Sequence, residues 1–78
     1  MRNDYHVVES EGSWWVVLAG KVVGAAQRTQ ELAITHARSL AHTDWNIKGQ
    51  QAQIHVHRPN GIIRTEWTYG NDPPQYPG

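Results

Sequence analysis

The sequence predicts an α+β fold, with an antiparallel sheet of four to five strands and one helix packed on one face. β-Branched and aromatic residues dominate the apolar set: seven Val and five Ile stand against three Leu, beside four Trp and three Tyr. Such residues favour strands. One stretch instead repeats apolar residues every three or four positions, which is typical of a helix. With 78 residues, we expect a single compact domain over residues 1–70 and a Pro-rich extended tail over residues 71–78.

The first third of the chain predicts a hairpin followed by a short third strand. The β-prone run 5–10 ends at the turn-forming residues 11–13, and the apolar run 14–19 follows. Gly20-Lys21 suits a second tight turn. A short strand over 22–26 is expected next, weakened by Gly24.

A helix is predicted after Thr29, whose hydroxyl can cap the first turn. Glu31 complements the positive end of the helix dipole. One apolar stripe then recurs at helical spacing, formed by Ala33, Ile34, Ala37, Leu40 and Ala41. We expect the helix to end by residues 43–44.

The last third predicts a second hairpin. Residues 52–57 alternate, with Ala52, Ile54 and Val56 on one face. The segment 58–61 contains Pro-Asn-Gly and predicts a turn. Strict alternation along 62–69 would place Ile63, Thr65, Trp67 and Tyr69 on one face and Ile62, Arg64, Glu66 and Thr68 on the other.

Several short motifs carry a family resemblance. They are Trp15-Val16-Val17 or Trp14-Trp15-Val16, the helical residues from Thr29 to Ala41, Ile54-His55, the segment Asn60 to Ile63, and Tyr69 to Pro73. In these motifs and in the order of its elements, the chain resembles the small prokaryotic proteins of domain-of-unknown-function family 2188. The resemblance implies a compact β-rich domain with one helix, and it brings no catalytic residues.

Composition and motifs exclude several function classes. Seven Lys and Arg balance seven Asp and Glu, and this neutrality disfavours nucleic-acid binding. The absence of cysteine removes thiolate catalysis and zinc–thiolate sites. The longest apolar run, 14–19, is too short to span a membrane. Without a nucleophile elbow, phosphate loop or signal segment, we expect a cytoplasmic protein with no enzymatic activity, catalytic residue, metal ligand or cofactor.

The sheet face without a helix is the predicted contact surface. Because Trp14 and Trp15 are consecutive on a strand, one of them must point to that face. We predict a protein-binding or self-assembling module, acting as a homodimer or with another protein. The predicted partner-binding residues are Trp14, Trp15, His55, His57, Arg64 and Trp67.

Two alternative functions use the same face. The first is weak single-stranded nucleic-acid binding through tryptophan, His55, His57 and Arg64. The second is metal binding at His55-x-His57, because residues i and i+2 of a strand share a face. Further ligands would have to come from Asp72, Glu66, Glu9 or His6, and no spacing enforces any of them.

Overall fold

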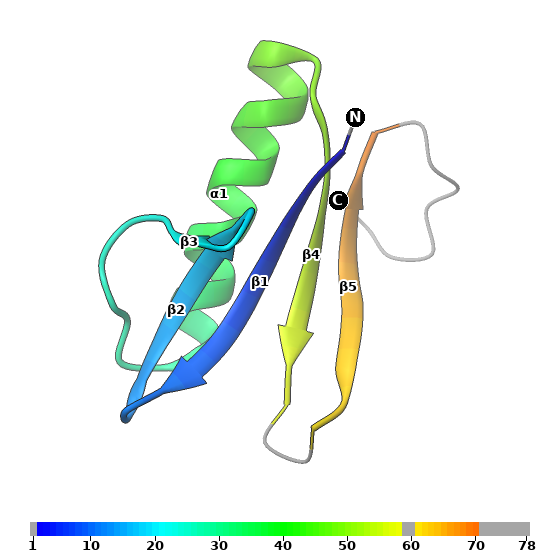
Figure 1. Cartoon of the computed structure of the whole chain (residues 1–78). Coiled ribbons are helices and arrows are strands. Elements are labelled where there is room, and N and C mark those ends of the chain that lie inside the picture. The colour runs from blue at the N-terminus through cyan, green and yellow to red at the C-terminus, as the bar shows by residue number, and fades with distance from the viewer. Residues whose placement is uncertain (1, 59–60, 71–78) are drawn as a thin grey trace.

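The computed structural model describes residues 2–58 and 61–70, which form five strands and one helix (Figure 1). The elements are β1 (Arg2–Ser10), β2 (Ser13–Leu18), β3 (Lys21–Val22), α1 (Gln30–Lys48), β4 (Gln51–His57) and β5 (Ile63–Tyr69). The predicted α+β class is thus confirmed. The tail predicted over 71–78 and the Pro59-Asn60 turn centre lie outside the described residues. Within the described part, no helix is long and apolar enough to cross a membrane.

The sheet is mixed, with strand order β3-β2-β1-β4-β5. The β1–β2 and β4–β5 pairs are antiparallel, as predicted. The central pair β1–β4 is parallel, with Tyr5 opposite Ile54, so the prediction of a wholly antiparallel sheet is wrong. The physical reason is the connection: α1 returns the chain to the end of the sheet where β1 begins (Figure 1), and parallel neighbours require such a crossover.

The third strand is shorter than predicted and covers only Lys21–Val22. Beyond it, Gly24 has a positive φ of 82°, and a Cβ at this position would lie 2.4 Å from Nε2 of His36 on the helix. Glycine suits this position, because it adopts a positive φ without a Cβ penalty and leaves room for the His36 ring. The chain bends away at Gly24 and meets the sheet once more at Gln27, whose N–H and C=O pair with those of Trp14, before α1 begins.

The helix begins as predicted and ends later than predicted. The Thr29 side chain accepts a hydrogen bond of 3.1 Å from the amide of Leu32. The helix continues through residues 44–48 and ends at Gly49, whose φ is 68°. The Gly49 N–H donates to the Trp45 carbonyl, and the Gln50 N–H donates to the Asp44 carbonyl. It continues because Asp44 is buried and Trp45 packs against the core, so this polar segment has tertiary contacts that extend the helix.

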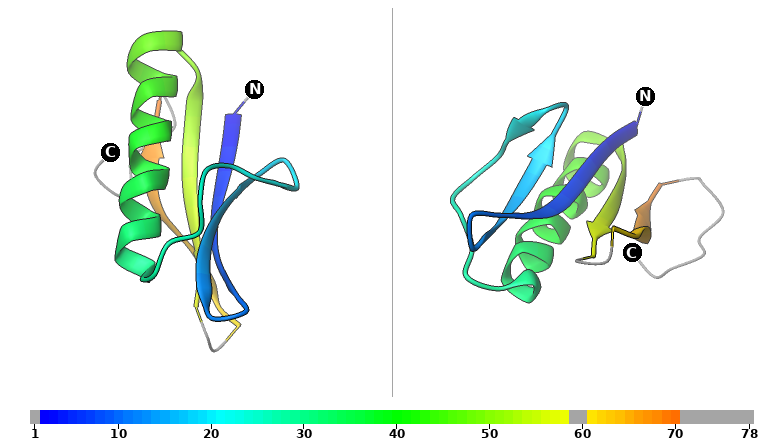
Figure 2. Two further views of the ribbon diagram at one scale, coloured as in Figure 1. Left: turned by 90° about the vertical axis from the view of Figure 1, so that its left-hand side faces the viewer. Right: turned by 60° about the horizontal axis from the view of Figure 1, so that its bottom comes forward.

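The core lies on one side of the sheet only. Ala33, Ala37 and Ala41 are fully buried along α1, and their small side chains let the helix lie close to the strands. The largest fully buried side chains facing them from the sheet are Val7, Val16, Ile54 and Val56. Figure 2 shows α1 running along this face, while no described helix lies on the opposite face. We call the two sides the covered face and the open face.

A β-bulge in β5 changes which side chains share a face. Trp67 lies opposite Ile54, but Thr65 lies opposite His55, so Glu66 is an extra residue at the register shift. Thr65 therefore sits on the open face, whereas Trp67 lies on the covered face. The prediction that these two share a face is wrong, because it assumed strict alternation. Arg64, opposite Val56, also belongs to the covered side.

Candidate functional site

The open face carries two adjoining groups of side chains. The first, on β1, β4 and β5, is the histidine cluster: Asp4, His6, His55, His57 and Thr65. The second, on β1, β2 and β3, is the apolar patch: Val8, Trp15, Val17 and Val22. The strand registers place each group on neighbouring strands, because His6 aligns with His55, Val8 with Trp15, and Val17 with Val22.

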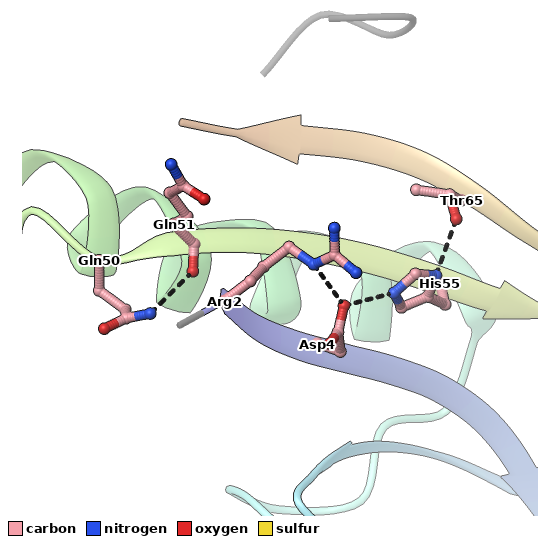
Figure 3. Close-up of polar contacts among 6 residues, drawn as sticks. All are labelled: Arg2, Asp4, Gln50, Gln51, His55 and Thr65. Atoms are coloured by element: carbon pink, nitrogen blue, oxygen red, sulfur yellow. Dashed lines mark hydrogen bonds and ion pairs between the residues drawn. The ribbon is translucent and has the colours of Figure 1, made fainter. Parts of the chain in front are cut away.

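A line of hydrogen bonds crosses three strands in the histidine cluster (Figure 3). Nε2 of His55 lies 2.9 Å from Oδ1 of Asp4, and Nδ1 of His55 lies 2.8 Å from Oγ1 of Thr65. The same Asp4 oxygen accepts a 3.0 Å hydrogen bond from Nε of Arg2. Because an ionised carboxylate only accepts hydrogen bonds, Nε2 of His55 carries a proton. Both ring nitrogens of His55 are therefore engaged.

His6 lies between the other two histidine rings. It stacks on His55 with ring centroids 4.9 Å apart and meets His57 edge-on at 5.1 Å. Nδ1 of His6 is 2.9 Å from Nε2 of His57. His57 stands one position beyond the last β1–β4 pair, Val7 with Val56. The parallel pairing thus brings together histidines that are far apart in the sequence.

The surroundings shift two pKa values in this cluster. Burial alone would raise the pKa of Asp4, but the hydrogen bond from His55 and the charge of Arg2 outweigh it and lower that pKa below 3.8. Burial lowers the pKa of His6 below 6.5, and the neighbouring His55 and His57 lower it further, against the opposing effect of Asp4. At neutral pH the cluster therefore combines an ionised carboxylate with an uncharged His6.

The order carboxylate, imidazole, hydroxyl in Asp4, His55 and Thr65 is also that of a hydrolase triad. Catalysis would further require a substrate cleft and positioned donors for an oxyanion. Here the carboxylate end is partly open, since the Asp4 side chain is 38% exposed and also binds Arg2. The observed role of these hydrogen bonds is to fix the His55 ring. The expectation that the protein has no enzymatic activity stays a prediction.

The apolar patch forms a shallow hollow of about 200 Å³, lined by its four residues and Ser10. The indole Nε1 of Trp15 donates a 3.1 Å hydrogen bond to the Ser10 carbonyl, which fixes the ring across the strand end. Val22 is 53% exposed. The patch is therefore a preformed apolar surface that, among the described residues, no helix covers.

The structure divides the predicted partner-binding residues between the two faces. Trp15, His55 and His57 lie on the open face. Trp14 packs against the core on the covered face. Trp67 is also there, with the Arg38 guanidinium 5.0 Å above its ring, and Arg64 shares that side. Arg64 and Trp67 therefore do not join the histidines.

Sequence reasoning missed most of the histidine cluster. It named His6 only as one of several possible additional ligands, and it did not place Asp4 or Thr65 in a site. The alternation of β1 gave a usable signal, because Asp4, His6 and Val8 share one face. Using that signal required knowing that β1 lies beside β4.

Metal binding through His55-x-His57 is not supported by the ring contacts, because both His55 nitrogens already have partners. Across residues 2–58 and 61–70, no group of three or more His, Asp or Glu side chains is arranged to hold a metal ion. A closed structural zinc site, which needs four ligands, is therefore not formed by the described part of one chain.

Comparison with protein families adds one finding. The model of domain of unknown function 2188, described as an uncharacterized protein conserved in bacteria, matches residues 5–69. The chain belongs to this family. The resemblance seen in the sequence is thus confirmed. The matched residues include the apolar patch and every member of the histidine cluster except Asp4. Comparisons with curated proteins and with solved structures gave no match.

Proposed function

We propose that this protein is a non-enzymatic self-association module that pairs with a second copy through its open sheet face. The observation that carries the proposal is the apolar patch, which crosses three adjacent strands on the face opposite α1. Burying such a surface against another protein is favourable, since apolar area removed from water contributes about 25 cal/mol per Å². Tryptophan is also enriched at the centres of protein interfaces.

A second copy suits this face in charge and in size. The chain has a formal net charge of zero, so two copies approach without net repulsion. A standard interface buries about 800 Å² per partner, a modest share of the 5070 Å² surface of this molecule. Five strands at a spacing of about 4.8 Å provide a broad face for that contact.

Single-stranded nucleic acid is a poorer match for the open face. Arg64 lies on the other side of the sheet, and Arg2 forms an ion pair with Asp4 on the open face. The Asp4 carboxylate itself would repel phosphates. Among the partners predicted from the sequence, the side chains of this face therefore favour protein over nucleic acid.

The test compares two equally exposed apolar residues on opposite sides of the molecule. Val22 in the apolar patch is 53% exposed, and Leu32 on α1 is 49% exposed. In sedimentation equilibrium we expect a dimer for the wild type and for Leu32→Glu, and a monomer for Val22→Glu. Both substitutions add the same charge, so only the position differs.

Thermal unfolding of each variant verifies that it is folded before its mass is interpreted. A wild-type protein that stays monomeric at the highest attainable concentration would overturn the proposal. Equal loss of the dimer in both variants would also contradict it, since net charge rather than the patch would then control association.

A further inference from the structure

The geometry points to a second role for the open face: His6 and His57 form a two-histidine site for a divalent transition-metal ion, with water completing the coordination. Both ligands belong to one chain, so the site does not require self-association. It also differs from His55-x-His57, because its ligands come from two parallel strands, β1 and β4.

The distance between the two ring nitrogens fits ligands of one ion. Nδ1 of His6 and Nε2 of His57 are 2.9 Å apart. Zinc–imidazole bonds are about 2.0–2.1 Å long, so two imidazoles at adjacent positions around one ion hold their nitrogens about 2.9–3.4 Å apart. To bind one ion, each ring must turn so that its lone pair leaves the line between the two nitrogens, and the ion then replaces the hydrogen bond between them.

His55 holds this pair in place and is not itself a ligand. Its two nitrogens are engaged by Asp4 and Thr65, and its ring stacks on His6 at 4.9 Å. The stack limits rotation of His6 toward the sheet and leaves Nδ1 directed at His57. His55 is therefore a matched control residue, with the same chemistry, the same face and the neighbouring position.

Ion binding needs no net loss of a proton when both rings are neutral. In the His6–His57 hydrogen bond one nitrogen carries the proton and the other accepts it. When an ion binds, that proton moves to the other nitrogen of its own ring, through water, and both facing nitrogens donate lone pairs.

An open hollow borders one of the two proposed ligands, His57. β1 and β4 separate after Val7 and Val56, where their pairing ends (Figure 1). A hollow of about 270 Å³ lies there, lined by Val8, Glu9, Trp14, His57 and Arg58. The Arg58 guanidinium is held by Gln30 and by the Glu66 carboxylate, which forms an ion pair with it.

Two imidazole ligands define the expected selectivity. Affinity for nitrogen sites increases along the first-row divalent ions to Cu²⁺ and then falls at Zn²⁺. We therefore expect Cu²⁺ to bind more tightly than Zn²⁺, and Mg²⁺ and Ca²⁺, which prefer oxygen ligands, not to bind measurably at this site.

Isothermal titration with CuCl₂ and ZnCl₂ tests the site on the full chain. We expect one ion per chain in the wild type. His6→Gln and His57→Gln should each weaken binding by more than about tenfold, because even the loss of an outer-shell partner of a metal ligand costs about that much affinity. His55→Gln should weaken binding less than either. Val22→Glu, which we expect to be monomeric, should still bind one ion per chain, and this separates the ion site from dimerisation.

Histidine ring NMR of the wild type provides a test without any substitution. Substoichiometric Zn²⁺ should shift the ring signals of His6 and His57 more than that of His42, which is exposed on α1. The site is overturned if His42 responds first, if His55→Gln abolishes binding as fully as His57→Gln does, or if binding saturates at one ion per two chains.

Discussion

The two faces of the central strand pair, β1 and β4, differ in chemistry although the same two strands supply the side chains of both. On the covered face, Val7, Ile54 and Val56 are fully buried under α1. On the open face, the alternate positions carry His6, His55 and His57, each only partly buried. Strand alternation thus separates the residues that stabilise the fold from the residues available for binding.

One carboxylate from each side of the sheet, Asp44 and Asp4, can be compared, and their surroundings differ. Asp44 on the covered side is 5% exposed. One of its oxygens accepts hydrogen bonds from the Tyr5 hydroxyl at 2.5 Å and from Asn3 at 3.0 Å, and Lys48 lies 3.9 Å from the other. Asp4 on the open side is partly solvated. Losing a partner therefore destabilises the protein more at Asp44 than at Asp4.

The largest expected difference between the faces comes from adjacent residues of β4. Ile54→Ala removes a fully buried side chain and should lower the free energy of unfolding by about 2–5 kcal/mol. Gln53→Ala, on the open face, should change it by no more than about 0.5 kcal/mol. Urea unfolding measures both, and equal effects would show that the open face is as tightly packed as the covered face.

A smaller effect is expected at the Asp44 site. Tyr5→Phe leaves the ring in the core but removes a hydrogen bond to a buried carboxylate, which should cost about 1–3 kcal/mol. Burial, followed by the hydrogen bond and charge of Asp44, raises the pKa of the Tyr5 hydroxyl well above 10.0. The wild type should therefore lose stability as pH rises above 10.0, because the unfolded chain ionises first. Tyr5→Phe should reduce that loss, which alkaline urea titrations would measure.

On the open face, the histidine cluster should respond to mild acid. The pKa of His6 is lowered in the folded chain, so its contribution to stability is complete above pH 6.5 and is lost as pH falls through the folded value. We expect the free energy of unfolding of the wild type to decrease between about pH 7 and pH 5, and less steeply for His6→Gln. Parallel slopes for the two proteins would rule out His6 as the origin of the decrease.

The smallest effect is expected at the margin of the covered face. Arg38→Gln removes the cation above the Trp67 ring and should cost about 0.5–1 kcal/mol. Arg28→Gln, in the segment before α1, removes the same charge and serves as the control. A change in Trp fluorescence in the first variant, and none in the second, would locate the effect at Trp67.

Local signals in the sequence predicted much of the covered face. The Thr29 cap, the alanine stripe and the opposite placement of Trp14 and Trp15 follow from short-range chemistry and periodicity, and the structure confirms all three. The helical continuation through Asp44 was not predictable in this way, because it depends on Tyr5 and Asn3, about 40 positions earlier.

The histidine cluster was less predictable for two physical reasons. Alternation states which residues share a face, but it does not state which strands are neighbours, so the alignment of His6 with His55 had no local signature. The bulge at Glu66 reverses the expected faces of Thr65 and Trp67, and nothing in the alternating residues of β5 indicates an insertion.

The parallel β1–β4 pair has a consequence for how the chain folds. Each hairpin forms from residues close in sequence, but the two hairpins join only after β2, β3 and α1 have been traversed. Such a non-local pairing pays the entropy of closing a long loop before it gains contacts, which slows folding. During synthesis, the edge of β1 that pairs with β4 stays unpaired until β4 has left the ribosome. We therefore expect the rate-limiting step of folding to be the docking of the second hairpin, with α1, onto the first.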